Sequence, residues 1–95
     1  MFVILVTYKK PLDVIDQYIA EHSAHLERGY QKNYFVVSGR KNPRTGGVII
    51  SHLKDRSLLE NFISEDPFAI QDIADYEIIE FTPGKRHPDF AKLIE

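Results

Sequence analysis

The segment YFVVSGRKNPRTGGVIISHL, residues 34–53, decides the fold. Its two ends, YFVVSG and GVIISHL, are short runs rich in β-branched and aromatic residues, which predict two strands, the second beginning at Gly47. Between them, the segment from Gly39 to Gly47 holds glycine, proline and charged residues and predicts a loop. This loop is long for a hairpin, yet it allows the two strands to be antiparallel neighbours.

A helix and a further strand are predicted on the N-terminal side of this segment. The unbroken apolar run from Phe2 to Tyr8 is typical of a strand covered on at least one face. Pro11 can occupy the first turn of a helix, and apolar residues then recur at helical spacing to about Gly29. We therefore expect one helix between the first two strands.

A second helix and a last strand are predicted on the C-terminal side of the segment. Ser57 and Glu60 have the spacing of a capping box, which predicts the start of a second helix. Pro67 either ends this helix or begins a new turn. Residues 76–81 predict the last strand, and the polar residues 82–95 a tail with a short terminal helix.

The predicted order is β, α, β, β, α, β, the ferredoxin-like arrangement of an α+β fold with an antiparallel sheet. Residues 1–95 have the length of one domain. Helices on one face of the sheet leave the other face open, so we expect a homodimer that covers the open face.

Composition excludes several classes of partner. The chain has 12 basic and 14 acidic residues and a net charge of −2, which provides no broad positive field for nucleic acid. The apolar run at the start is too short for a membrane span. Because the chain contains no cysteine, disulfides and thiolate chemistry are excluded, and a cytoplasmic location is expected.

Three motifs in order carry a resemblance to a known family. The segments HLERGYQKNYFVVSGRKNPRTGGVII, LLENFISEDPF and YEIIEF resemble the YCII-related (YciI-like) proteins of the dimeric α+β barrel superfamily. The most specific pieces are His25-Leu26, the Gly46-Gly47 pair and Asp66-Pro67-Phe68. The resemblance implies a pocket in which His25 and Asp66 form an acid/base pair.

The resemblance also implies a difference from many relatives and a range of chemistry. Many relatives have an arginine three positions before the histidine, where this chain has His22. One similar branch removes chloride from chlorinated hydroxyquinols, and related barrels isomerise lactones. A shared fold does not transmit an activity, so the site residues must decide.

His22 and His25 take different positions on a helical wheel of the first predicted helix. With Ile15 at the centre of the apolar stripe, His22 lies about 20° away and His25 about 80° away, at about 100° per residue. The wheel thus predicts that His22 is the more buried, as a core or pocket-wall residue. An imidazole at the margin of the stripe can reach both a pocket and its solvent, which favours His25 for proton transfer, with a surface position as the alternative.

Asp66 has two interpretations that the sequence leaves open. An aspartate between a helix and a proline often only caps the next turn. As a functional residue, it would accept a hydrogen bond from His25 and fix the tautomer of the ring.

The loop between the two central strands predicts a site for an anion. Arginine can bind a carboxylate through two hydrogen bonds, and glycine amides can approach an anion closely. Arg44 is favoured over Arg40 and Lys41 because its PRTGG context adjoins the strand, so we expect Arg44, Gly46 and Gly47 to bind substrate beside His22. An ordinary exposed loop would have a similar composition.

No cofactor or metal is predicted. His22 and His25 lack a third ligand at a suitable spacing, and no phosphate-binding or dinucleotide motif is present. The leading hypothesis is a small cofactor-independent lyase or isomerase, or a dehydrochlorinase-like enzyme, acting on a small polar or aromatic molecule. The alternative is a dimeric module that binds a small ligand without transforming it.

Overall fold

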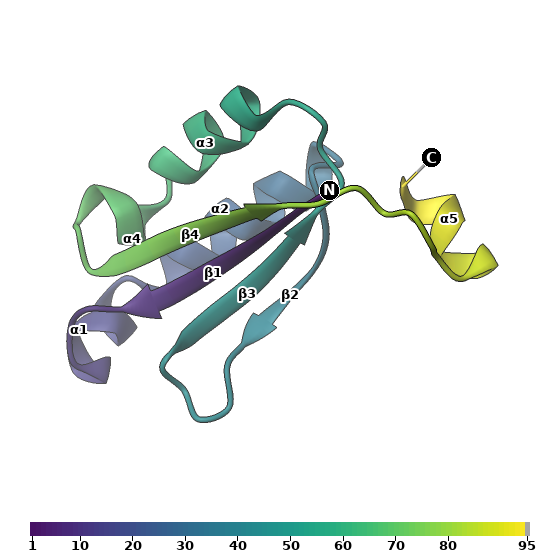
Figure 1. Cartoon of the computed structure of the whole chain (residues 1–95). Helices are drawn as coiled ribbons and strands as arrows, with labels where there is room; N and C mark the ends of the chain where they lie inside the picture. The colour runs from purple at the N-terminus through teal and green to yellow at the C-terminus, as the bar shows by residue number, and fades with distance from the viewer. Residues whose placement is uncertain (95) are drawn as a thin grey trace.

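The computed structural model describes residues 1–94, which form a four-stranded antiparallel sheet and the helices that cover it (Figure 1). In chain order the strands are β1 (Phe2–Tyr8), β2 (Phe35–Arg40), β3 (Gly46–Ser51) and β4 (Ala74–Glu80). Their order in the sheet is β2-β3-β1-β4, which places β1 between two neighbours. The predicted α+β fold with a ferredoxin-like sheet is confirmed, and the central position of β1 explains its unbroken apolar sequence.

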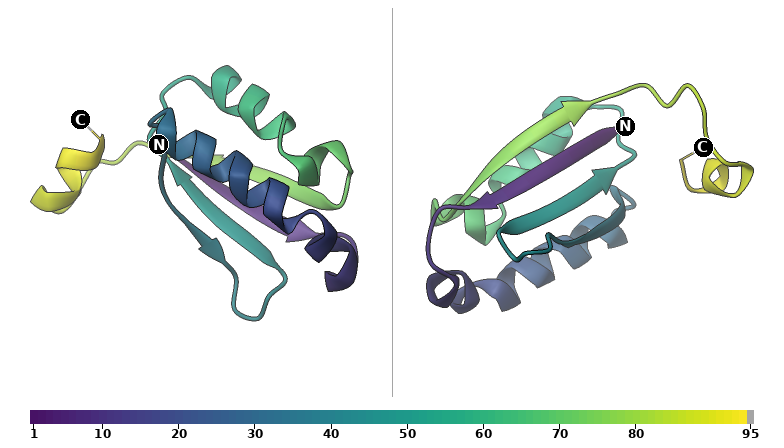
Figure 2. Two further views of the ribbon diagram at one scale, coloured as in Figure 1. Left: turned by 180° about the vertical axis from the view of Figure 1, so that it is seen from behind. Right: turned by 60° about the horizontal axis from the view of Figure 1, so that its bottom comes forward.

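The helices are α1 (Leu12–Gln17), α2 (Ile19–Gln31), α3 (Arg56–Ser64), α4 (Pro67–Ile70) and α5 (Pro88–Ile94). Figure 2 shows α2 and α3 side by side on one face of the sheet, with α1 and α4 near the end of the sheet where β1 stops. The last helix, α5, stands clear of the sheet on an extended connection (Figure 1). The helices that pack against the strands therefore all lie on one face of the sheet.

The single helix predicted from Pro11 to about Gly29 is wrong, because α1 and α2 are separate. They meet at Tyr18, whose backbone angles of φ −116° and ψ 4° fall outside the helix. The Tyr18 N–H donates to the carbonyl of Ile15, three residues earlier, at 3.0 Å. Such a bond tightens the last turn of a helix, so α2 starts afresh with a direction of its own.

Two aspartates, rather than a serine, cap helices α3 and α4. The predicted cap at Ser57 is wrong, because α3 begins at Arg56 and the side chain of Asp55 accepts from the backbone N–H of Leu58 at 3.2 Å. Asp66 caps α4, and Pro67 begins that helix as a new turn. Aspartate is as good an N-cap as serine, since its carboxylate accepts from an unpaired helical N–H.

The core lies between the sheet and the helices. Alternate residues of β1 point into it, and Phe2 and Ile4 are fully buried. The other core residues are Val6, Ile15, Phe35, Ile49, Leu59, Phe62, Ile63, Phe68, Ile73 and Ala74. In the part of the chain that the structure describes, no helix is long and apolar enough to cross a membrane.

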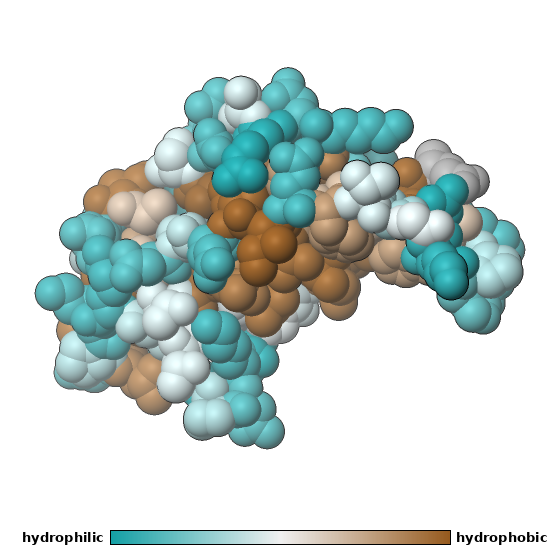
Figure 3. All heavy atoms as spheres, viewed as in Figure 1, coloured by the Kyte–Doolittle hydropathy of each residue, from teal (hydrophilic) through white to brown (hydrophobic). Residues whose placement is uncertain are grey.

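The opposite face of the sheet is not covered by any described helix. Val3 and Leu5 of β1 pair there with Ile50 and Val48 of β3, and Ile79 of β4 adjoins them. Figure 3 shows this face, where hydrophobic side chains gather over the strands.

Gly46 of β3 lies where the backbone of β1 leaves no room for a side chain. A Cβ atom added there would lie 1.8 Å from the carbonyl oxygen of Val6 in the neighbouring strand. Because this oxygen belongs to the backbone, no change of side-chain rotamer can relieve the clash. In contrast, a Cβ at Gly39 in β2 would meet nothing within 4 Å. The GG pair thus has a structural reason at its first position.

We expect Gly46→Ala to lower the free energy of unfolding by about 3 kcal/mol or more, because β1 and β3 would have to separate. Gly39→Ala is the matched control, and its effect should stay within about 0.5 kcal/mol. Urea denaturation of both variants measures the difference. Equal stability of the two variants would contradict the close approach at Gly46.

Candidate active site

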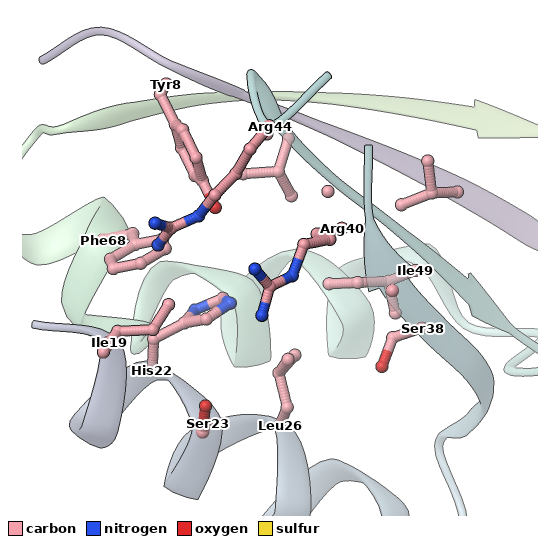
Figure 4. Close-up of a pocket in the computed structure, with 15 residues that line it drawn as sticks. Tyr8, Ile19, His22, Ser23, Leu26, Ser38, Arg40, Arg44, Ile49 and Phe68 are labelled. Carbon is pink, nitrogen blue, oxygen red and sulfur yellow. The ribbon is translucent and has the colours of Figure 1, made fainter. Parts of the chain in front are cut away.

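A cavity of about 190 Å³ opens between α2 and the loop that joins β2 to β3 (Figure 4). We call it the α2 cavity. It takes side chains from α2, from the strands, from the loop and from α4. Its lining residues are Val6, Tyr8, Ile19, His22, Ser23, Leu26, Ser38, Gly39, Arg40, Arg44, Gly46, Gly47, Val48, Ile49 and Phe68.

His22 and Asp66 form a close pair at the inner wall of the cavity. Nδ1 of His22 lies 2.9 Å from each carboxylate oxygen of Asp66. The ring of Phe68 stacks on the imidazole, with ring centroids 3.9 Å apart and planes 5° apart. The histidine is therefore held by a hydrogen bond at its edge and by an aromatic ring on its face.

The Asp66 carboxylate is buried, with 2% of the residue exposed. Its Oδ1 also accepts from the backbone N–H of Phe68 at 2.9 Å, the bond that caps α4. The capping interpretation of Asp66 is confirmed, and the carboxylate also holds a histidine, but that histidine is His22 and not the predicted His25. Asp66 does not line the cavity itself but lies behind the ring of His22.

The contact with Asp66 fixes the tautomer of neutral His22. An ionised carboxylate can only accept a hydrogen bond, so Nδ1 carries the proton and donates it to Asp66. The remaining nitrogen, Nε2, then has a free lone pair. It makes no hydrogen bond to any described residue, and Figure 4 shows the ring directed into the cavity. A proton acceptor therefore faces the space where a ligand would bind.

The predicted contact between His25 and Asp66 is wrong. His25 is 2% exposed, and its Nε2 lies 2.9 Å from the backbone carbonyl of Phe62, to which it donates. Its Nδ1 lies 3.3 Å from the guanidinium of Arg28 and accepts from it. Because both ring nitrogens have partners away from the cavity, His25 has no nitrogen free for a substrate.

Burial also determines the charge of His25. It lowers the pKa of the imidazole, and the nearby negative charge of Asp66 opposes this effect without cancelling it. A neutral ring suits the two bonds that His25 makes, one as donor and one as acceptor. The wheel's prediction that His22 is the more buried histidine is wrong as well, since 13% of the His22 side chain is exposed.

Tyr76 of β4 adds a phenol to the surroundings of Asp66. Its hydroxyl is buried and makes no direct hydrogen bond of normal geometry within residues 1–94. Burial raises the pKa of this hydroxyl, and the charge of Asp66 raises it further. The phenol therefore keeps its proton. Tyr76 was not among the sequence-based candidates, since nothing in a strand pattern distinguishes it from a core residue.

The predicted anion-binding residues line the cavity, and one further arginine lines it with them. Arg44, Gly46 and Gly47 line it as expected, but so does Arg40, which was given less weight. Lys41 does not line the cavity, and its ammonium donates to the Thr7 hydroxyl at 3.2 Å. The missed signal for Arg40 is its place in β2 opposite Gly47, which turns its side chain to the helical face.

The residues present do not assemble a metal site. Within residues 1–94, no group of three or more histidine, aspartate or glutamate side chains is close enough to hold a metal ion. The cavity itself brings together a base, two guanidinium groups and serine hydroxyls.

Comparison with known proteins identifies the family. The family model described as the YCII-related domain matches residues 1–82. The chain belongs to the YCII-related family. The match ends where the polar tail begins, so the tail and α5 lie outside the family domain. None of the curated proteins matches the chain.

A solved structure shares the fold. It is 5-chloro-2-hydroxyhydroquinone dehydrochlorinase (TftG) from Burkholderia phenoliruptrix AC1100, in complex with 2,5-dihydroxybenzoquinone. The TM-score is 0.70 at 20% sequence identity, over 86% of this chain and 94% of TftG. This chain and TftG therefore share one fold.

We expect the two histidines to be opposite tautomers when neutral, because Asp66 accepts from Nδ1 of His22 and Phe62 accepts from Nε2 of His25. Long-range ¹H–¹⁵N correlation spectra at pH 8 measure this directly. Asp66→Asn should alter the pattern of His22 alone. A shared tautomer in the wild-type protein would contradict the assigned bonds.

Proposed function

We propose that this protein is a small cofactor-independent enzyme in which His22 and Asp66 catalyse proton transfer. The observation that carries the proposal is the contact of Nδ1 of His22 with both oxygens of Asp66, which leaves Nε2 free at the cavity. Asp66 orients the ring and stabilises the imidazolium that forms when Nε2 takes a proton. His22 takes the role that the sequence assigned to His25.

The arginines of the cavity complete the chemistry. Loss of a proton leaves negative charge on the substrate. The guanidinium groups of Arg40 and Arg44 line the cavity and can stabilise this charge. The reaction class is a lyase or isomerase step. In a dehydrochlorination, Nε2 takes a proton from the substrate, and the electron pair of the broken bond shifts into the conjugated system of the ring. Chloride then leaves with the electrons of its bond to carbon. The net loss is HCl, and no oxidant or reductant is needed.

The likeness to TftG supports a small aromatic or quinone-like substrate, since TftG is named for a chlorinated hydroxyhydroquinone and was solved with a hydroxylated benzoquinone. The cavity volume of about 190 Å³ is below the ~300–1,000 Å³ of pockets for drug-sized ligands, which favours a single ring.

The alternative, a module that only binds a ligand, was suggested by His22 in place of the family arginine. His22 is itself paired with Asp66, so the replacement supplies a base instead of removing a function. We therefore favour catalysis. Binding without turnover across a panel of chlorinated hydroxyquinols, hydroxylated quinones and lactones would favour the alternative.

We expect His22→Asn to lower kcat by about 10²-fold or more, because the amide cannot take the proton. Chloride release and the absorbance of the quinone product measure turnover of 5-chloro-2-hydroxyhydroquinone, the first substrate to test. His25→Gln is the matched control, because its amide can still donate to the Phe62 carbonyl, and its turnover should change little. Loss of activity only in the His25 variant would refute the assignment.

We further propose that two copies pair through the open face of the sheet. Val37 and Ile79 are 50% and 43% exposed on this face, where they border the apolar pairs of β1 and β3. Burying an apolar face of this kind stabilises an association. A cytoplasmic location stays a prediction.

We expect Ile79→Lys to weaken dimerisation about tenfold or more, because the charge would be buried against apolar residues. Ile70→Lys on α4 is the control, since Ile70 is 65% exposed but lies away from the sheet face. Sedimentation velocity over a concentration series measures both variants. A monomeric wild-type protein at high concentration would contradict the dimer.

A further inference from the structure

The charges around the α2 cavity are nearly balanced by internal pairs. His22 is paired with Asp66, as described above. Arg44 is paired with Asp16 of α1, with Nη2 and Oδ1 2.5 Å apart. His22 and Arg44 therefore each already face a carboxylate of the same chain.

The carboxylate of Asp16 offsets the positive charge that Arg44 brings to the wall of the cavity. The carboxylate raises the pKa of Arg44, and the guanidinium lowers the pKa of Asp16, so both groups are charged near neutral pH. The Arg44 side chain is 26% exposed and the Asp16 side chain 52%, so the pair lies at the rim of the cavity, where solvent and salt screen it in part. A ligand that used Arg44 fully would have to displace Asp16.

Arg40 differs from Arg44 in having no such partner. Its guanidinium makes no hydrogen bond or ion pair with any described residue, although its charge is near enough to Asp16 to help lower the pKa of that carboxyl. Figure 4 shows it reaching into the middle of the cavity, beside the ring of His22. A guanidinium offers two parallel N–H donors to one carboxylate or to two neighbouring oxygens. The hydroxyl of Ser23 lies on the opposite wall of the same space.

We propose that the cavity selects small ligands with a single negative charge, which Arg40 binds, and that Asp16 sets this limit by neutralising Arg44. The inference rests on the proposed function insofar as it names the substrate class of that site. The ligand class comprises carboxylates, phenolates and enolates of one ring or a short chain. A second negative charge would meet Asp16, and a neutral ligand would leave Arg40 without a partner.

Three unreactive probes of similar shape test the charge rule: benzoate, isophthalate and neutral benzamide. Titrations by NMR at constant ionic strength and pH 7.5 give the affinities. We expect the wild-type protein to bind benzoate about tenfold more tightly than either other probe, since one charge-assisted hydrogen-bond pair contributes at least this much.

Variants separate the two arginines. Asp16→Asn frees Arg44 and should raise the affinity for isophthalate about tenfold, with a smaller change for benzoate. Asp13→Asn is the matched control, because it removes the same charge from α1 at an exposed position outside the cavity, and it should change neither affinity. Arg40→Gln should weaken benzoate binding about tenfold.

Three results would overturn the inference: isophthalate binding as tight as benzoate binding, no response to Asp16→Asn, or no loss in Arg40→Gln. Because the probes do not react, these results are independent of catalysis. Selective binding of benzoate together with no turnover of any substrate would refute the proposed enzyme alone. Turnover that depends on His22 without selectivity for charge would refute this inference alone.

Discussion

The site depends on the hydrogen bonds that the buried carboxylate of Asp66 accepts. One residue connects two helices, since it caps α4 through the N–H of Phe68 and holds Nδ1 of His22 on α2. The same helix start places the Phe68 ring against the imidazole and in the core. A carboxylate removed from water is costly unless its oxygens are satisfied. The fold satisfies them with the two groups that also define the site.

The layout of the fold could be predicted from the sequence because it follows from simple periodicity. The apolar runs of β1 and β3 and the turn-rich loop between β2 and β3 are local signals that tertiary contacts do not reverse. The boundaries were less predictable. A break in a helix depends on the backbone angles of one residue, Tyr18, and aspartate and serine compete equally for a cap, as at Asp55 and Ser57. Neither choice leaves a mark on the hydrophobic pattern.

The prediction of which histidine is more buried was wrong for a related reason. The wheel took Ile15 as its reference, but Ile15 belongs to α1, whereas His22 and His25 belong to α2, which starts in a new direction after Tyr18. Angles counted across that break have no common axis. Of the residues that the sequence singled out, Arg44 lines the cavity and Asp66 lies beside it. Which guanidinium remains unpaired depends on Asp16, a contact between distant segments that no local pattern contains.

The two ends of the domain lie together, at the opposite end of the sheet from the cavity. The terminal ammonium of Met1 donates to the carbonyl of Phe81 at 3.0 Å, and Phe2 pairs with Glu80, whereas Tyr8 at the other end of β1 lines the cavity. Any polypeptide joined to either end would therefore extend away from the mouth of the site. The fold can be tethered, tagged or built into a larger chain without obstructing the entry of a small molecule.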